Sequence, residues 1–234
     1  MLTDEQLHAI MPALPKAKRT IFVPFLNGAL TEFGIQSPAR LAAFLAQLAH
    51  ESGELRFMQE LWGPTPAQVR YEPQSTLATR LGNTEAGDGK RFKGRGPIQI
   101  TGRDNYRRYG DLLGVDLVFS PAEAALPELA FRIAGLFWKK NGLNQLADEA
   151  TAAAFKEITR RINGGFNGLV ERERFYAVAK ETLGVPAARR GRAARTRKPR
   201  AARPPVFERG AEAIRAASKR KRSAPRKTSR KTTR

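Results

Sequence analysis

Apolar residues recur at helical spacing through most of the first 185 residues, and this pattern predicts a mainly helical fold. The expected helices span residues 3–11, 18–33, 38–51, about 104–113, 127–140, 151–162 and 170–183. The start of the third helix is well marked, because Ser37 is a suitable N-cap and Pro38 fits the first helical position. We therefore expect residues 1–185 to form a single helical domain.

The third helix places a carboxylate where its pattern calls for an apolar side chain. Glu51 lies three residues after Leu48 and seven after Phe44, so it falls on the stripe that faces the core. Ser52 and Gly53 follow and are expected to end the helix. A carboxyl group among apolar neighbours has a raised pKa, which suits a general acid. Alternatively, the end of the helix frays and Glu51 points into water.

Glu60 is the candidate partner of Glu51. On one continuous helix, nine residues would separate the two carboxylates by about 13 Å and place them on opposite faces. A break at Ser52 and Gly53 lets the chain turn back, so that both carboxylates could line one cleft. Glu54 competes for the same role, although it follows the break directly and is expected to face solvent.

Helical periodicity is lost between residues 63 and 103, where glycine, proline and polar residues dominate. Within this region Ile98 and Ile100 alternate with Gln99 and Thr101, which predicts a short strand with one buried face. Gln99 and Thr101 would share the other face and could hold a water molecule or a sugar. The alternative is an edge strand whose polar face is simply exposed to solvent.

A second glycine-rich stretch, residues 162–168, follows the predicted helix 151–162. A helix cap and a turn are enough to explain its glycines. They do not explain Asn163, which remains available for a separate role.

Several kinds of chemistry are disfavoured by the composition. The chain has no cysteine and two histidines, which excludes thiolate metal sites and disulfides. His50 and Glu51 begin like a zinc-protease motif, but Glu54 stands where the second histidine would be. No serine has the surroundings of a hydrolase nucleophile. We expect a monomer with no metal and no cofactor.

Charge divides the chain into two parts. Residues 186–234 hold 19 Lys and Arg against two Asp and Glu, so that this segment carries +17 of the total charge of +20. We expect it to be a disordered basic tail with a possible amphipathic helix near 206–217. Such a tail would bind either an anionic outer-membrane surface or nucleic acid. Because the chain begins with an acidic helix start, we expect no signal peptide, and no apolar run is long enough to predict a membrane span.

Taken together, the motifs "AHESGE" with Glu60 after it, "FKGRGPIQITGRDNY" and "RINGGFNGLVERERFY" resemble family 19 glycoside hydrolases, which are chitinase-like members of the lysozyme superfamily. The connecting "LFWKKNGLNQLAD" is similar to the bacterial and phage endolysin branch. The resemblance covers roughly residues 35–184. It implies a two-lobed, lysozyme-like helical domain with a substrate cleft, plus the separate tail.

The resemblance also implies an inverting mechanism with Glu51 as the acid and Glu60 as the base. Inverting enzymes keep these carboxyl groups about 6.5–9.5 Å apart to admit a water molecule. Thr101 matches a position that orients this water, and Arg172 matches an arginine that tunes the acid and base. The other matching polar residues, expected to contact sugar or support the carboxylates, are Gln99, Asn105, Tyr106 and Asn163. The short 63–93 region implies fewer sugar subsites.

Two substrates fit this resemblance, because chitin and peptidoglycan both contain β-1,4-linked N-acetylglucosamine. We favour an endolysin that cleaves peptidoglycan strands, made in the host cytoplasm and released to the periplasm and cell wall by a holin. We recognise no chitin-binding module and expect no signal peptide, and both points argue against a secreted chitinase. A chitinase acting on chitin oligosaccharides is therefore kept as the alternative. A non-enzymatic wall-binding or histone-like nucleic-acid-binding protein is a third possibility, although the body offers no basic face for it.

Overall fold

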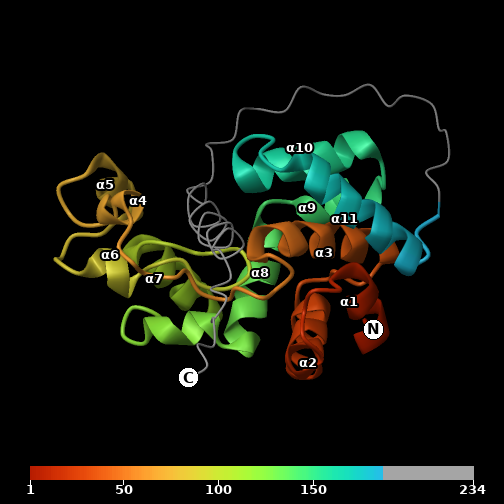
Figure 1. The fold of residues 1–234 in the computed structure, drawn as a ribbon, viewed down its shortest axis with the longest axis horizontal. Coiled ribbons are helices and arrows are strands. Elements are labelled where there is room, and N and C mark those ends of the chain that lie inside the picture. The colour runs from red at the N-terminus through yellow and green to blue at the C-terminus, as the bar shows by residue number, and fades with distance from the viewer. Residues whose placement is uncertain (187–234) are drawn as a thin grey trace, which may run out of the picture.

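The computed structural model describes residues 1–186, which form eleven α-helices and one 3-10 helix (Figure 1). The helices are α1 (Asp4–Ile10), α2 (Lys16–Glu32), α3 (Pro38–Ser52), α4 (Pro66–Val69), α5 (Thr76–Leu81), α6 (Asp88–Arg91), α7 (Arg103–Leu113), the 3-10 helix η1 (Pro121–Ala125), α8 (Pro127–Lys140), α9 (Leu143–Asp148), α10 (Ala152–Asn163) and α11 (Leu169–Thr182). All seven helices expected from periodicity are present. The predicted mainly helical fold is therefore confirmed.

The helix that carries Glu51 is built as its sequence indicates. The Ser37 hydroxyl accepts a hydrogen bond from the backbone N–H of Arg40 at 3.3 Å, which caps the start of α3. Gly53 ends the helix in the left-handed conformation, with φ of 57°. Glu51 lies in the last helical turn, so the alternative of a frayed end is wrong.

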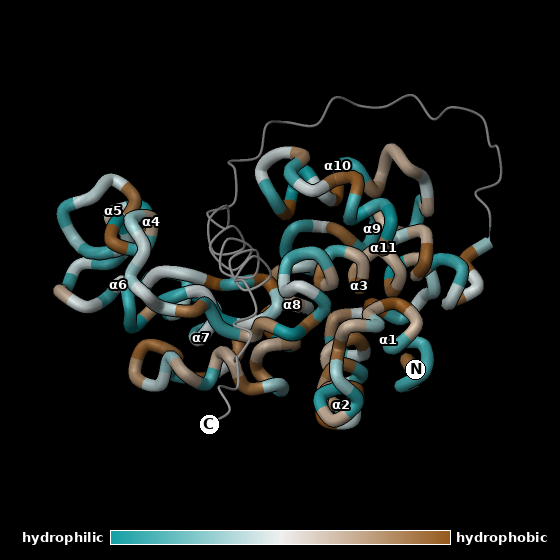
Figure 2. The backbone as a smooth tube through the Cα atoms, viewed as in Figure 1, coloured by the Kyte–Doolittle hydropathy of each residue, from teal (hydrophilic) through white to brown (hydrophobic). Residues whose placement is uncertain are grey.

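The main core is formed where the long helices pack against one another. α3 packs most extensively against α11, and α2 packs along α8. Phe44 of α3 meets Trp138 of α8 edge to face, with ring centroids 5.2 Å apart. In Figure 2, brown apolar segments of α2, α3 and α8 adjoin teal polar ones, as expected for helices with one buried face.

Helices α4, α5 and α6 form a second group, set apart from the long helices in Figure 1. A small cluster of its own, consisting of Tyr71, Leu77 and Leu81 with Trp62 packed against it, lies in this part of the chain. The helices have four to six residues, too few to show a helical period, and periodicity therefore missed them. The ion pair between Asp88 of α6 and Arg103 of α7, at 2.6 Å and largely buried, ties this group to the rest.

The strand predicted at residues 98–101 is wrong. The segment is a tight turn in which Gln99 has a φ of 55°, a left-handed value that a strand residue does not adopt. Arg95 and Ile100 exchange two backbone hydrogen bonds, of 2.9 and 3.1 Å, and close the turn. Within residues 1–186 such contacts are isolated bridges, and no strand forms. Gln99 and Thr101 are both buried, so the solvent-facing alternative is also wrong.

The predicted tail, residues 186–234, and its possible helix near 206–217 lie outside the described residues except for Pro186. The domain boundary near residue 185 therefore stays a prediction. Among residues 1–186, none of the helices combines the length and the apolar character that crossing a bilayer requires.

Candidate active site

Glu51 is held by a charged partner from another helix. Arg172 of α11 donates a hydrogen bond from Nη2 to Oε1 of Glu51. The side chain of Arg172 is 1% exposed and that of Glu51 is 11% exposed, so the pair is largely removed from water. The helical pattern indicated apolar neighbours for Glu51, and the structure adds the guanidinium group of Arg172, which the family resemblance had pointed to.

A chain of side-chain hydrogen bonds fixes the position of Arg172. Its Nη1 donates to Oε1 of Gln47, which lies one turn before Glu51 on α3, at 2.5 Å. The Nε2 of Gln47 donates in turn to the hydroxyl of Thr159 on α10 at 2.9 Å. Arg172 also donates from Nε to the carbonyl of Asn167 at 3.2 Å. Three helices therefore determine where the guanidinium group meets Glu51.

Glu60 is held mainly by backbone and amide groups. Its carboxylate accepts hydrogen bonds from the N–H of Gly94 at 3.0 Å and from Nε2 of Gln68 at 3.1 Å. Its own N–H donates to the Gly94 carbonyl at 2.8 Å. A Cβ at residue 94 would lie 2.6 Å from Oε1 of Gln99, so a larger residue there would have to displace the end of the Gln99 side chain. The glycine thus lets the backbone approach both Glu60 and Gln99.

Burial raises the pKa of Glu60 above the ordinary glutamate value, since desolvation disfavours the carboxylate. Hydrogen bonds from Gly94, Gln68 and Tyr71 and the positive charge of Lys93 act in the opposite direction but do not cancel the effect. Glu60 is completely buried in this structure. A raised pKa moves the titration of the carboxyl towards neutral pH, where a general base works well.

Glu54, the competing candidate for the base, is used elsewhere. The backbone of Glu54 has a φ of 63°, directly after the end of α3. Its Oε2 accepts a hydrogen bond from the N–H of Ala13, in the loop between α1 and α2, at 2.7 Å. This contact ties Glu54 to the N-terminal segment, so the geometry favours Glu60 as the partner of Glu51.

The turn after Gly94 brings Gln99 and Thr101 together. The Thr101 hydroxyl donates to the carbonyl of Gln99 at 3.0 Å, and Nε2 of Gln99 donates to the carbonyl of Gly96 at 2.6 Å. Oε1 of Gln99 is buried and has no hydrogen-bond partner among residues 1–186. The Nδ2 of Asn163, in the last turn of α10, is in the same state. Buried polar atoms are normally paired, so these two atoms are candidates for contact with a ligand.

Asn105 and Tyr106 have contacts that support the turn. Nδ2 of Asn105 donates to the carbonyl of Thr101 at 2.7 Å. Tyr106 is buried and donates to the carbonyl of Lys93 at 2.6 Å, while its oxygen accepts from Nη1 of Arg95 at 2.8 Å. The Tyr106 hydroxyl both donates and accepts a hydrogen bond within the protein, so Tyr106 supports the turn, and its predicted sugar contact stays a prediction.

Sequence reasoning missed Gln47, Gln68 and Gly94 as parts of the site. Gln47 could have been found, because it precedes Glu51 by four residues and therefore shares its helix face. Gln68 is the third residue after Thr65 and completes the capping box that Thr65 begins, a signal that the apolar pattern does not include. The pairing of Gly94 with Glu60 depends on how two loops meet, which no local pattern encodes.

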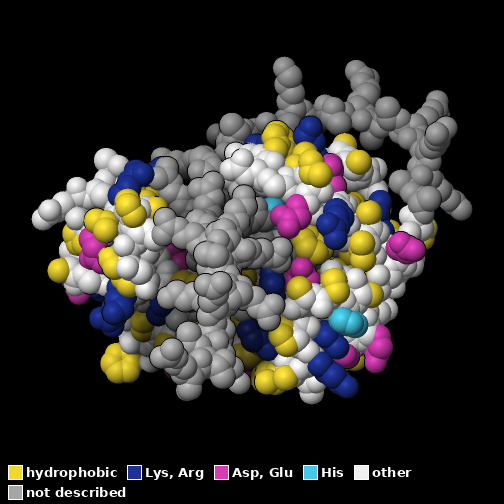
Figure 3. Space-filling model, viewed as in Figure 1, with side chains coloured by type: hydrophobic (Ala, Val, Ile, Leu, Met, Phe, Trp, Pro, Cys, Tyr) yellow, Lys and Arg dark blue, Asp and Glu magenta, His cyan; other side chains and the backbone are white. Residues whose placement is uncertain are grey.

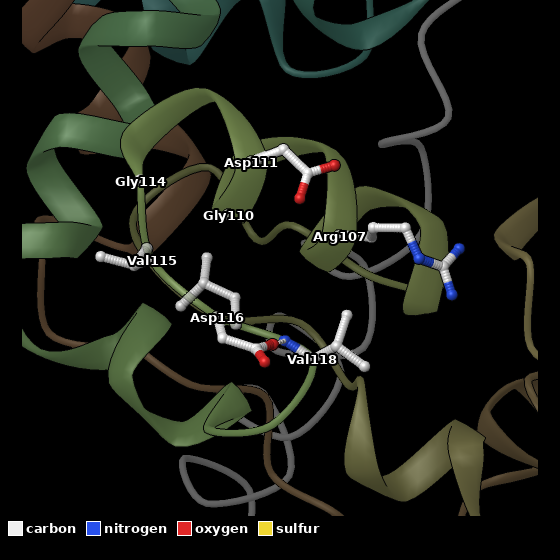
Figure 4. A pocket seen from close by; sticks show the side chains of 8 residues that line it. Arg107, Gly110, Asp111, Gly114, Val115, Asp116 and Val118 are labelled. Atoms are coloured by element: carbon white, nitrogen blue, oxygen red, sulfur yellow. Dashed lines mark hydrogen bonds between the residues drawn. The ribbon is translucent and has the colours of Figure 1, made fainter.

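Two further observations concern other kinds of site. Within residues 1–186 no group of three or more His, Asp and Glu side chains is arranged to hold a metal ion. A surface cavity of about 580 Å³ lies between α7 and the loop that follows it (Figure 4). It is lined by residues such as Arg107, Asp111 and Asp116 and contains none of the predicted site residues.

The chain is similar to known proteins over most of the described region. A family model described as chitinase class I matches residues 30–168. A Haemophilus influenzae protein named as a glycosyl hydrolase family 19 domain-containing protein is 34% identical over 174 residues, covering 64% of this chain and 84% of that protein. An Arabidopsis thaliana endochitinase is 35% identical over 156 residues, covering 66% of this chain and 50% of the endochitinase. This chain therefore spans about half the length of that plant relative.

Solved structures share the fold. A bacterial family 19 chitinase aligns with a TM-score of 0.61 at 22% identity, covering 79% of this chain and 95% of that one. Chitinase C from Streptomyces griseus aligns with a TM-score of 0.58, also at 22% identity, covering 78% and 76%. The matched family segment includes Glu51, Glu60 and the whole turn around Gln99 and Thr101. The chain therefore belongs to glycoside hydrolase family 19.

Proposed function

We propose that this glycoside hydrolase cleaves β-1,4 glycosidic bonds of bacterial peptidoglycan by an inverting mechanism, with Glu51 as the acid and Glu60 as the base. The roles follow from the resemblance to family 19, and the observation that carries the two-carboxylate site is that the matched family segment holds both glutamates in largely buried positions. Glu51 is paired with Arg172, whereas Glu60 is buried among neutral donors. Environments that differ in this way can set two carboxyl groups to different tasks.

In this mechanism Glu51 donates a proton to the glycosidic oxygen as the bond to the leaving sugar breaks. Glu60 accepts a proton from the water that attacks the anomeric carbon on the opposite face. Each oxygen of Glu60 already accepts one hydrogen bond, from Gln68 or from Gly94. A carboxylate offers about four acceptor positions, so a lone pair remains for the attacking water.

Thr101 is suited to orient this water. Its hydroxyl proton is donated to the Gln99 carbonyl, so its oxygen can act only as an acceptor towards a second partner. A water between Thr101 and Glu60 would then donate one proton to each, which leaves its lone pair for the sugar carbon. The separation of the two glutamate carboxyls expected for inversion, about 6.5–9.5 Å, stays a prediction.

Charge supports peptidoglycan over chitin as the substrate. The chain carries a net charge of +20, while chitin is neutral and peptidoglycan carries carboxylates on its peptides. Opposite charge raises the local concentration of enzyme at its substrate. We also propose that the protein is an endolysin that reaches the wall by holin-type release. Chitin hydrolysis is the second candidate, because the plant relatives are named endochitinases.

The substrate is tested by incubating the purified protein with peptidoglycan and with chitin oligosaccharides. Mass analysis of soluble muropeptides should show cleavage of a sugar–sugar bond and identify which one is cut. Rapid release of products from chitin alone would replace peptidoglycan with chitin in this proposal. Release of nothing from either would favour a non-enzymatic binding protein.

The role of the basic segment is tested by ending the chain after Val185. The truncated protein should keep its activity on soluble peptidoglycan fragments and lose activity on cells, most clearly at low salt. At about 0.15 M salt the screening length is near 8 Å, so the two forms should converge. On the face seen in Figure 3, Lys and Arg side chains are interspersed with acidic and apolar ones. Residues 1–185 carry only +3 of the total charge of +20, so they should add little to nucleic-acid binding. Equal action of both forms on cells would assign the basic segment to nucleic acid instead.

A further inference from the structure

Residues 90–95, at the end of α6 and just after it, include two arginines that are used by the fold. Nη2 of Arg91 donates to the carbonyl of Val118 at 3.0 Å. Arg95 donates to the Tyr106 hydroxyl and to the carbonyl of Arg91, each at 2.8 Å. Each of these arginines therefore already has a hydrogen-bond partner within the protein.

Lys93 differs from these arginines. Among residues 1–186, no carboxylate forms an ion pair with its ammonium group. The side chain is half-buried, whereas that of Lys90 in the same segment is exposed. A cation that has lost part of its water without gaining a partner is unfavourable. Burial accordingly lowers the pKa of Lys93, and the nearby charge of Arg95 lowers it further.

The position of Lys93 relative to Glu60 is well defined. The next residue, Gly94, accepts a hydrogen bond from the Glu60 N–H at 2.8 Å and donates its own N–H to the Glu60 carboxylate at 3.0 Å. The carbonyl of Lys93 accepts the hydrogen bond of Tyr106 at 2.6 Å, which fixes the backbone on the other side. The positive charge of Lys93 acts to lower the pKa of Glu60, and the negative charge of Glu60 acts to raise the pKa of Lys93. Lys93 is therefore a cation held next to the candidate base.

We propose that Lys93 forms a subsite for a substrate carboxylate beside the base, and so favours peptidoglycan over chitin. The inference rests on the proposed peptidoglycan activity. Chitin contains only neutral N-acetylglucosamine. In peptidoglycan every second sugar bears a lactyl group, which carries either a free carboxylate or a stem peptide with carboxylates of its own. A carboxylate at this place would give the ammonium group the partner that the protein does not supply.

The test compares Lys93→Gln with the parent protein on three soluble substrates of equal length. These are glycan strands with stem peptides, strands stripped of peptide so that the lactyl carboxylates are free, and chitin oligosaccharides. Lys90→Gln is the matched control, since it removes an exposed positive charge from the same segment. Lys93→Arg should retain most of the preference. Rate constants are taken on the plateau of each pH profile, because loss of the Lys93 charge also affects Glu60.

We expect Lys93→Gln to lower kcat/KM on carboxylate-bearing strands about tenfold more than on chitin, mainly through KM, and Lys90→Gln to change neither. A loss confined to peptide-bearing strands assigns the subsite to a stem-peptide carboxylate, and a loss on stripped strands assigns it to the lactyl group. Equal losses on all three substrates, or no loss, would overturn the inference.

A binding measurement separates this inference from the proposed function. Stripped strands are titrated into Glu51→Gln, with and without Lys93→Gln, so that no cleavage is needed for a signal. Weaker binding with Lys93→Gln supports the subsite even if the parent protein cleaves only chitin, a result that would defeat the peptidoglycan proposal alone. An affinity for stripped strands that is the same with and without Lys93→Gln would overturn the subsite, whichever substrate the enzyme cleaves.

Discussion

Glu51 and Glu60 lie nine residues apart in the sequence, but the structure holds them in different ways. Glu51 sits at the end of a long helix, and its partner Arg172 of α11 is fixed by Gln47 of α3 and by the carbonyl of Asn167 in the loop before α11. Glu60 lies in a loop, and its carboxylate is held by the backbone of Gly94 and the amide of Gln68. One glutamate thus depends on a buried ion pair and the other on neutral donors.

This difference shows how a helical domain can give two glutamates that are close in sequence different surroundings, as an acid and a base require. Glu51 meets a guanidinium group from another helix, whereas the neutral donors around Glu60 only partly offset its desolvation. The helix end at Ser52 and Gly53 separates the two environments within a few residues. The following predictions test whether these environments are as distinct as the contacts indicate.

The largest expected effects come from removing the carboxylates themselves. Glu51→Gln and Glu60→Gln should each lower kcat on soluble peptidoglycan by at least about a hundredfold, the usual scale for lost acid–base catalysis. Glu54→Gln is the control and should stay within a few-fold, because Glu54 contacts Ala13 instead. Inactivation by Glu54→Gln with an active Glu60→Gln would transfer the role of base to Glu54.

The next test breaks the ion pair on the helical side. Arg172→Met leaves a largely buried Glu51 without its cation, and the free energy of unfolding should fall by about 3–5 kcal/mol. Arg132→Met is the control, since the Arg132–Glu32 pair is more exposed and should contribute less than about 1 kcal/mol. Urea denaturation measures both. A small loss in Arg172→Met would mean that packing, not charge, holds Glu51.

Sequence patterns captured the helical side of this comparison better than the loop side. The caps of α3 at Ser37 and Gly53 and the buried stripe that includes Phe44 were all predicted, because helix signals are local. The turn at Gln99 was mistaken for a strand. Its alternating residues are buried on both sides by contacts from distant segments, and a period of two cannot reveal that.

The candidate site shows the same division. Glu51 was placed on its helix face by spacing alone, but its pairing with Arg172 joins residues far apart in the sequence and came only from the family resemblance. The contacts of Glu60 with Gln68 and Gly94 came from neither source, because they depend on how loops fold against each other.

A smaller effect is expected at the water-orienting residue. Thr101→Ala should lower kcat about tenfold, or about 1.4 kcal/mol, because water can still bind in a less ordered way. Combined with Glu60→Gln, the loss should be less than additive, since both residues act on one water. A double-mutant cycle on soluble substrate measures this. Full additivity would show that Thr101 acts independently of Glu60.

The smallest effect is a shift in pH dependence. The base must lose its proton, and the pKa of Glu60 is raised, so kcat/KM should rise with pH through a midpoint above the ordinary glutamate value. Gln68→Met removes a bond that lowers this pKa, so the midpoint should move further up. Thr65→Ala disturbs the same capping box without touching Glu60 and serves as the control. If the midpoint does not move in Gln68→Met, a group other than Glu60 determines the rise of kcat/KM with pH.

The stereochemistry of the first product tests the central claim most directly. If Glu60 activates water on the face opposite the proton delivered by Glu51, cleavage of a β-linked strand must first give the α-anomer. Proton NMR of a soluble peptidoglycan strand, recorded before the new reducing end equilibrates, distinguishes the two anomers. We predict the α-anomer at the earliest time points. The β-anomer would indicate retention and contradict the assignment of Glu60 as a base.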